Sequence, residues 1–248
     1  MKTIVLGASS GLGRCIGIGL AKKGADVALL ARRADMLDDA AAEAGPTSFA
    51  VPCDVTEPSS VRAAIDQATS RLGGLDGLVY ATGVGTLARL IDTGADSWQR
   101  LFATNVTGAA IVTAAALPHL VESNGVAIYL SSVSASITAP WPGLGAYLVS
   151  KAALDKLIEA LRGEHPTVGF TRLIVGDTAG GEGAGMTQFA NDWDPELAME
   201  LGQLWVERAL LTGSLLDVEE LVSTVDYVLG RSGGTNIPSV AVVPRRPA

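Results

Sequence analysis

The chain has 248 residues, of which 48% are hydrophobic and 18% charged, and this composition supplies a buried core and excludes a disordered chain. Its formal net charge of -8 argues against a nucleic-acid partner, because a diffuse acidic surface repels phosphate backbones. Prolines and charges are scattered rather than gathered in a linker, so we expect one domain over residues 1–248.

Apolar segments of strand length alternate with longer helical segments along the chain. The expected strands are residues 3–6, 25–31, 47–51, 75–81, 126–130, 168–175 and 239–243. The expected helices are residues 11–23, 58–72, 96–121, 146–162 and 218–229. Because the strands are almost continuous in Val, Ile, Leu and Ala, both their faces should be covered. This order predicts an α/β fold: a Rossmann-like, doubly wound parallel sheet of about seven strands with helices on both faces.

The first expected strand runs directly into GASSGLG, residues 7–13. Glycine lets the backbone turn tightly and removes the Cβ that a pyrophosphate would meet, and the N-terminus of the next helix attracts an anion. A tight turn without a ligand and an S-adenosylmethionine site use similar glycines, but a position after the first strand favours a dinucleotide. The candidate phosphate-binding residues are Gly7, Ser9, Ser10, Gly11, Leu12 and Gly13.

The end of the second expected strand addresses the choice of dinucleotide. Ala31 stands where an NAD site usually carries an acidic residue, and Arg32 and Arg33 follow it. Guanidinium groups bind a 2′-phosphate well, so the sequence favours NADP(H) over NAD(H). The alternative is a pair of solvated arginines at the start of a helix, paired with acidic residues in 35–39.

Tyr147 and Lys151 are four residues apart in an expected helix and therefore share one face. An ammonium near a phenol favours the phenolate, which predicts a tyrosine pKa lowered from about 10 toward the working range. Such a tyrosine can exchange a proton with a carbonyl or alcohol oxygen.

These residues, taken together, resemble the short-chain dehydrogenase/reductase family in its single-domain form. GASSGLG is similar to the glycine motif of that family, although Leu6 replaces the usual preceding threonine. CDV at 53–55, NVTG at 105–108, LSSVSA at 130–135 and YLVSK at 147–151 resemble its other motifs. YATG at 80–83 departs from the usual Asn-Ala-Gly, and Gly176-Asp177 departs from the usual Pro-Gly.

The resemblance implies a role for each matching residue. Tyr147 would be the general acid in reduction and the base in oxidation, Ser132 would polarise the substrate oxygen, and Lys151 would hold the nicotinamide ribose. Asn105 would help hold a water on the proton path. Ser134 is an alternative to Ser132, because the spacing to Tyr147 is slightly longer than usual. Further cofactor contacts would come from Asp54, Val55, Ala81, Thr82, Gly83 and Thr178.

Residues 178–212 form a long insertion after a late strand, which is typical of a substrate lid. Apolar bulk in this segment and in 134–146 indicates a small, mainly apolar carbonyl or alcohol substrate, although the same side chains suit a core or a subunit contact. The residues concerned are Trp141, Leu144, Met186, Phe189, Trp193, Leu204 and Trp205.

We expect a cytoplasmic protein without a metal site, signal peptide or membrane-spanning run, in which Cys15 and Cys53 are buried thiols. The resemblance implies a homodimer or homotetramer through helices 96–121 and 146–162, whose small residues permit close packing. These include Ala109, Ala110, Ala114, Ala115, Ala152 and Ala153.

Three functions fit the sequence. The first is an NADP(H)-dependent oxidoreductase of a carbonyl or secondary alcohol. The second is a catalytically idle dinucleotide-binding sensor or partner-binding module, which has no need of the set Asn105, Ser132, Tyr147 and Lys151. The third, a methyltransferase, predicts an acid after the second strand and gives Tyr147 no use.

Overall fold

The computed structural model describes residues 1–181, 186–211, 213–231 and 234–245. Within these ranges seven strands form one parallel sheet in the order β3-β2-β1-β4-β5-β6-β7, which confirms the expected fold class. The strands are β1 (Lys2–Leu6), β2 (Asp26–Ala31), β3 (Ser48–Pro52), β4 (Gly77–Tyr80), β5 (Val126–Ser132), β6 (Gly169–Val175) and β7 (Ser239–Val242). The order reverses beside β1, whose neighbours are β2 and β4, and a crevice therefore opens beyond the carboxyl ends of β1 and β4.

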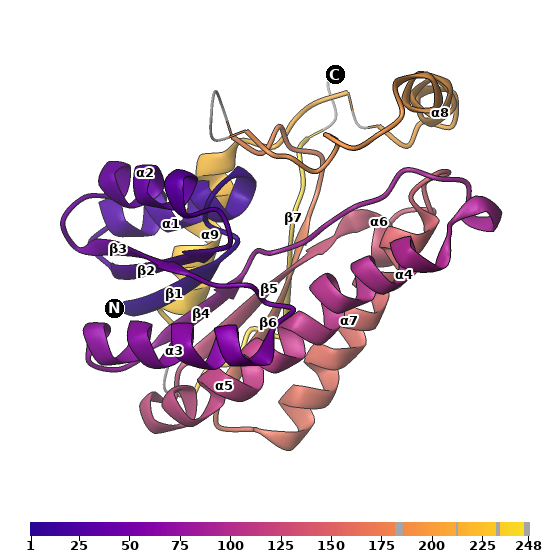
Figure 1. Cartoon of the computed structure of the whole chain (residues 1–248). Helices are drawn as coiled ribbons and strands as arrows, with labels where there is room; N and C mark the ends of the chain where they lie inside the picture. Colours follow the sequence, from indigo (N-terminus) through magenta and orange to yellow (C-terminus); the bar gives the residue numbers. More distant parts are fainter. Residues whose placement is uncertain (182–185, 212, 232–233, 246–248) are drawn as a thin grey trace.

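Helices cover both faces of the sheet (Figure 1). One face carries α1 (Gly11–Lys22), α2 (Ala34–Ala44) and α9 (Val218–Leu229), whose buried side chains pack in one cluster with β1 and β2. The other face carries α3 (Pro58–Leu72), α5 (Gly108–Ser123) and α7 (Gly145–Glu164). The central strands are apolar on both faces because both faces are packed.

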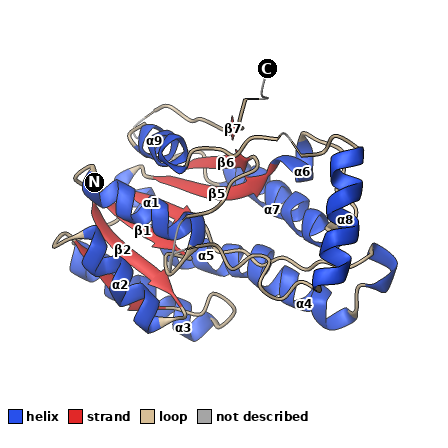
Figure 2. Ribbon diagram, turned by 90° about the horizontal axis from the view of Figure 1, so that it is seen from above, coloured by secondary structure: helices blue, strands red, loops and turns tan. Residues whose placement is uncertain are grey.

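Helix α8 (Pro195–Glu207) belongs to neither layer and lies on the side where α4 (Ala95–Phe102) and the short α6 (Val133–Ser136) are found (Figure 2). Asp194 caps its N-terminus by accepting from the Leu197 N–H at 2.8 Å. Leu201 and Trp205 on α8 are buried against Leu144 and Leu148. This packing fixes α8 over the start of α7.

The expected helix 96–121 is a composite of α4, a π-helical turn η2 (Ala103–Thr107) and α5. Together they make a continuous helix, Ala95–Ser123, that is long and apolar enough to cross a membrane by length and composition. The expectation that no run reaches that length is therefore wrong. Length and composition are weak evidence for a membrane, because core helices share them. In this helix 44% of the apolar window is buried, and Val112 and Leu120 are fully buried.

Three other local expectations are wrong or incomplete. Helix α2 was not among the expected helices, although Leu37, Ala40 and Ala44 bury one of its faces at helical spacing. Cys53 is buried as expected, whereas Cys15 is only half-buried. Ala109 faces the core and is fully buried, so it is unavailable for packing between subunits. A short 3-10 turn, η1 (Leu90–Asp92), precedes α4.

Candidate active site

The loop between β1 and α1 is a cradle that only glycine fits. Gly7 has a φ of +79°, and a Cβ placed on it would lie 2.8 Å from the Thr82 nitrogen. A Cβ on Gly13 would lie 2.4 Å from the Gly7 carbonyl oxygen. The Gly7 and Ala8 N–H groups donate to the Leu30 carbonyl at 2.8 and 3.2 Å, which ties the loop to β2. The loop is therefore held tight by its neighbours, and no side chain fits at Gly7 or Gly13.

The N-terminus of α1 is open to an anion. Helix geometry leaves the first N–H groups of α1, from Gly11 to Gly13, without partners in the helix. Ser10 occupies the N-cap position, yet among the described residues its side chain makes no capping hydrogen bond. Its hydroxyl instead accepts from Arg33 Nη2 at 2.6 Å, and Ser9 Oγ accepts from the same nitrogen at 2.9 Å. A guanidinium and a helix N-terminus thus converge on one loop, an arrangement that suits phosphate.

The two arginines after β2 have different surroundings. Arg33 lies over the glycine loop and also donates to Gln188 Oε1. Burial, and then the proximity of Arg32, lower the pKa of Arg33, and a bound anion would relieve both effects. Arg32 places its positive charge near Asp54. Burial alone would raise the pKa of Asp54, but hydrogen bonds from Thr56 and the charge of Arg32 outweigh it and lower that pKa.

Tyr147 and Ser132 meet at the carboxyl end of β5. The Ser132 hydroxyl lies near enough to Tyr147 to lower its pKa, and Ser132 Oγ lies 2.8 Å from Ser134 Oγ. Both serines therefore belong to one hydroxyl pair, of which Ser132 is the member that affects the phenol. The sequence-based preference for Ser132 over Ser134 as the group that faces a substrate oxygen stays a prediction.

Lys151 does not lower the pKa of Tyr147 in this structure, contrary to the sequence-based expectation. Burial raises the pKa of Tyr147 to about 12, the nearby Ser132 hydroxyl lowers it in part, and the nearby Asp155 raises it. Lys151 Nζ lies 5.9 Å from the tyrosine ring centroid and donates to the Leu130 carbonyl at 2.7 Å. The ammonium is thus directed at the backbone of β5, and desolvation dominates the phenol.

Lys151 is itself buried, which lowers its pKa from 10.5 to about 8, although Asp155 raises it. Burial also raises the pKa of Asp155, while Ser131, Arg172 and Lys151 lower it, and Arg172 Nη1 lies 3.3 Å from its Oδ2. Asp155 therefore favours the protonated form of Lys151 next to the phenol, whereas desolvation of the site favours the neutral amine.

The low pKa of Lys151 predicts a specific dependence of stability on pH. Between about pH 8 and pH 10.5 the unfolded chain binds this proton and the folded protein does not, so stability rises with pH. Relative to Lys151→Met, the wild type should gain on the order of 2 kcal/mol of unfolding free energy from pH 7 to pH 10. Urea unfolding of both proteins at the two pH values measures this, and parallel changes in both would contradict it.

Asn105 lies in the π-helical turn η2 and is fully buried. Its Oδ1 accepts from the Val84 N–H at 2.9 Å, and its Nδ2 donates to the Val84 carbonyl at 3.0 Å and to Ser150 Oγ at 2.9 Å. A Cβ on Gly83 would lie 3.3 Å from Lys151 Nζ and 3.6 Å from Asn105 Oδ1. Asn105 thus braces the loop after β4 close to Lys151, and a role in holding a water stays a prediction.

A single cavity of about 690 Å³ joins these groups, and its size is typical of a ligand site. Every predicted site residue except Asn105 lines it. They are Gly7, Ser9, Ser10, Gly11, Leu12, Gly13, Arg32, Arg33, Asp54, Val55, Ala81, Thr82, Gly83, Ser132, Tyr147, Lys151 and Thr178. Ser134, the alternative hydroxyl, lines it as well.

Part of the predicted lid lies over this cavity. Residues 182–185 and 212 lie outside the described residues, but Thr187, Gln188 and Phe189 line the cavity. Thr187 lies 3.4 Å from where a Cβ on Gly11 would be, and the Phe189 ring meets the Tyr147 ring edge-on at 5.0 Å between centroids. No sequence pattern points to Thr187 or Gln188, because their contacts join segments far apart in the chain.

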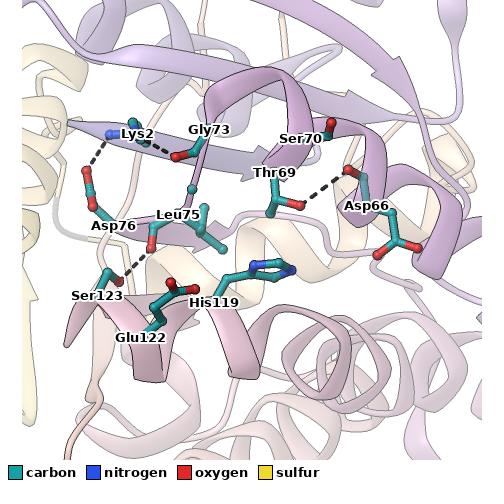
Figure 3. Close-up of a pocket in the computed structure, with 11 residues that line it drawn as sticks. Lys2, Asp66, Thr69, Ser70, Gly73, Leu75, Asp76, His119, Glu122 and Ser123 are labelled. Carbon is teal, nitrogen blue, oxygen red and sulfur yellow. Dashed lines mark hydrogen bonds between the residues drawn. The ribbon is translucent and has the colours of Figure 1, made fainter.

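A second hollow, of about 570 Å³, lies at the opposite edge of the sheet, beside Lys2 at the start of β1 (Figure 3). Several of its polar groups form hydrogen bonds with one another: Lys2 Nζ donates to the Gly73 carbonyl at 2.6 Å, and the Lys2 N–H donates to Asp76 Oδ2 at 2.8 Å. It lies far from the carboxyl ends of the strands, where the glycine loop and Tyr147 are.

Comparison with known proteins decides the family. The family model described as short chain dehydrogenase matches residues 2–190. This chain belongs to the short chain dehydrogenase family. The methyltransferase interpretation is therefore wrong, and the chain is placed among oxidoreductases that use nicotinamide dinucleotides.

Three similar proteins illustrate the range of this family. A short chain dehydrogenase of Pseudocercospora fijiensis is 37% identical over 65% of this chain and 53% of its own length. The inactive 2-(S)-hydroxypropyl-CoM dehydrogenase 2 of Xanthobacter autotrophicus is 31% identical over 71% of this chain and 76% of its own. The crystal structure of a short-chain type dehydrogenase/reductase from Mycobacterium marinum is 29% identical, with a TM-score of 0.81 over 97% of this chain and 93% of that one. The chain thus spans about half the length of the first of these relatives.

Proposed function

We propose that this short chain dehydrogenase is an NADP(H)-dependent oxidoreductase that interconverts a carbonyl and a secondary alcohol, with Tyr147 as general acid and base. The observation that carries the proposal is that Ser132, Tyr147 and Lys151 line the same cavity as the glycine cradle. Reduction of a carbonyl by a nicotinamide dinucleotide needs a phosphate site and a proton donor in one cavity.

The residues present fit a bound dinucleotide. The open N-terminus of α1, with Ser9, Ser10 and Arg33 beside it, would hold phosphates, and Asp54 and Val55 would border the adenine. Lys151 and Thr178 would lie toward the nicotinamide end. When bound, the cofactor supplies or accepts the hydride.

The protein's own groups would handle the proton. In reduction, the Tyr147 hydroxyl donates its proton to the carbonyl oxygen, and the Ser132 hydroxyl donates a hydrogen bond that polarises the same oxygen. A pKa of about 12 keeps Tyr147 protonated at neutral pH, which suits an acid in reduction. Lys151 would place its ammonium group, or its neutral amine as a hydrogen-bond donor, beside the phenol. Asn105 would help to hold a water near Lys151 through its contacts with the loop after β4.

A catalytically idle dinucleotide-binding protein is the second candidate. One relative, 31% identical, carries the word inactive in its name, and the Phe189 ring lies edge-on against the Tyr147 ring in this chain. Binding and turnover separate the two functions. A fluorescence titration with NADPH, NADH and S-adenosylmethionine tests the cofactor, and NADPH consumption with a panel of carbonyl compounds tests the reaction. Binding of NADPH without turnover of any carbonyl would favour the idle protein.

We further propose a cytoplasmic homodimer or homotetramer that associates through the outer faces of α4, α5 and α7. Ala114 and Ala152 are exposed there, and Val149 on α7 is 46% exposed. Sedimentation at micromolar concentration should give twice or four times the mass of the chain. A monomer mass at that concentration would reject the assembly.

A further inference from the structure

An ion pair lies behind the candidate active site, on the buried face of α7. Lys151 and Asp155 are four residues apart on this helix, share one face and are each 5% exposed. Arg172 on β6 brings its Nη1 to 3.3 Å from Asp155 Oδ2. Lys151 lines the cavity, whereas Asp155 and Arg172 are not among the described residues that line it. The Asp155 carboxylate is therefore a neighbour of Lys151 that does not itself face a ligand in the cavity.

Arg172 holds the Asp155 carboxylate in place from the sheet. Its Nε donates to Ser239 Oγ on β7 at 3.3 Å, so the guanidinium connects two strands with α7. The other carboxylate oxygen, Asp155 Oδ1, is buried and has no hydrogen-bond partner among the described residues, although the nearby Ser131 hydroxyl lowers the pKa of Asp155. A buried carboxylate of this kind acts strongly on a buried cation nearby, because the surroundings have a low dielectric.

Among the described residues, the other elements packed against α7 bring no second acid of this kind to Lys151. These elements are β5, β6, α4, η2 and α6, and neither η2 nor α6 carries an ionisable side chain. The ionisable side chains on the others are Asp96 and Arg100 on α4, Tyr129 on β5 and Arg172 on β6. Asp96 is exposed, and the Tyr129 hydroxyl lies 2.6 Å from Thr113 Oγ1. The acids of α8, which packs on the start of α7, are exposed as well: Glu196, Glu200 and Glu207.

The charge of Lys151 depends on the Asp155 carboxylate. Burial favours the neutral amine and lowers the pKa of Lys151 to about 8, although Asp155 acts in the opposite direction. Without Asp155, desolvation would act unopposed, and the amine would lose its proton nearer to neutral pH. Lys151 Nζ lies 5.9 Å from the centroid of the Tyr147 ring, so the phenol would then have a neutral amine beside it.

We propose that Asp155, anchored by Arg172, is a positioning residue that keeps Lys151 in its ammonium form beside Tyr147 at neutral pH. Asp155 acts through Lys151 and touches no ligand. The charge of Lys151 is a property of the folded chain, so it can be measured without cofactor and without turnover. One consequence, that Asp155 sets the upper pH limit of carbonyl reduction, rests on the proposed function.

The first test measures the charge of Lys151 directly on the full chain. The sequence contains five lysines: Lys2, Lys22, Lys23, Lys151 and Lys156. In protein labelled with ¹³C at lysine Cε, each lysine gives a signal that follows the protonation of its own Nζ, and Lys151→Met assigns the signal of Lys151. Asp155→Asn keeps the shape of the side chain and removes its charge. It should lower the pH midpoint of the Lys151 titration by about one unit or more, the size expected for loss of a nearby opposite charge.

Three further variants separate loss of charge from loss of structure. Asp155→Glu keeps the charge, so its midpoint should lie closer to that of the wild type than the midpoint of Asp155→Asn does. Glu159→Gln removes an acid that pairs with Lys156 on the exposed side of α7, and it should leave the Lys151 midpoint unchanged. Asp155→Asn/Arg172→Met leaves no buried charge of this ion pair without its partner, which protects folding, and it should lower the midpoint as Asp155→Asn does.

The second test is the pH profile of NADPH turnover in the same variants. In Asp155→Asn the falling limb at high pH should move to lower pH together with the Lys151 midpoint, whereas structural damage alone would lower turnover by one factor at every pH. An unchanged Lys151 midpoint in Asp155→Asn and in the double variant would overturn the proposal. A falling limb that stays in place although the midpoint moves would overturn it too. In a protein without turnover the midpoint alone decides, and a lowered midpoint would then reject the oxidoreductase function while supporting the effect of Asp155 on Lys151.

Discussion

Replacing Tyr147 with Phe should lower NADPH-dependent turnover of any accepted carbonyl by at least about 10²-fold. General acid–base catalysis contributes roughly this much or more, and the variant loses only the phenolic hydroxyl. The ring and its contact with Phe189 are kept, so the cavity should keep its shape. Turnover is measured by NADPH consumption, and NADPH affinity is measured by fluorescence titration of the same samples.

Tyr227→Phe is the matched control for this experiment. Tyr227 lies on α9, is 57% exposed and carries Arg231 over its ring, far from the catalytic groups in the chain. It should turn over NADPH at the wild-type rate. Equal rates for wild type and Tyr147→Phe would remove Tyr147 from the mechanism, whatever the control shows.

Arg33→Ala should weaken NADPH binding by about 10- to 100-fold and leave NADH binding within about twofold of wild type. The expected size follows from charge-assisted hydrogen bonds, which contribute about 1.5–3 kcal/mol. Arg33 is chosen because it contacts Ser9 and Ser10 on the glycine loop, which a 2′-phosphate would share. Fluorescence titration with both nucleotides gives the two affinities.

Two further variants make this measurement selective. Arg14→Ala removes a cation that pairs with Glu43 on α2, and it should change the affinities for NADPH and NADH only a little and by the same factor. Arg32→Ala should also weaken NADPH binding more than NADH binding. In this structure the charge of Arg32 lowers the pKa of Asp54. Equal weakening of both nucleotides by Arg33→Ala would show that the arginine supports the loop and does not read the phosphate.

The glycine cradle and the strands of the parallel sheet were predictable because they depend on local patterns. Gly7 and Gly13 are required by backbone geometry that short-range sequence encodes, and continuous apolar runs mark strands buried on both faces. Helix α2 was equally readable from Leu37, Ala40 and Ala44, but the polar residues around them concealed its buried face.

What the sequence could not show depends on three-dimensional surroundings. The spacing of Tyr147 and Lys151 predicts their common helix face but not that burial would outweigh the lysine, which instead donates to Leu130. The Trp205 ring contacts the rings of both Trp141 and Trp193, which are more than fifty residues apart in the chain, and no local pattern links them.

The most direct test of the account is a crystal structure of the chain with NADP⁺ and a carbonyl ligand. We expect the pyrophosphate at the N-terminus of α1, the 2′-phosphate on Arg33, and the Tyr147 hydroxyl within hydrogen-bonding reach of the carbonyl oxygen, about 2.6–3.2 Å. The carbonyl carbon should face C4 of the nicotinamide. A nucleotide bound elsewhere, or a nicotinamide ring whose C4 lies remote from Tyr147, would contradict it.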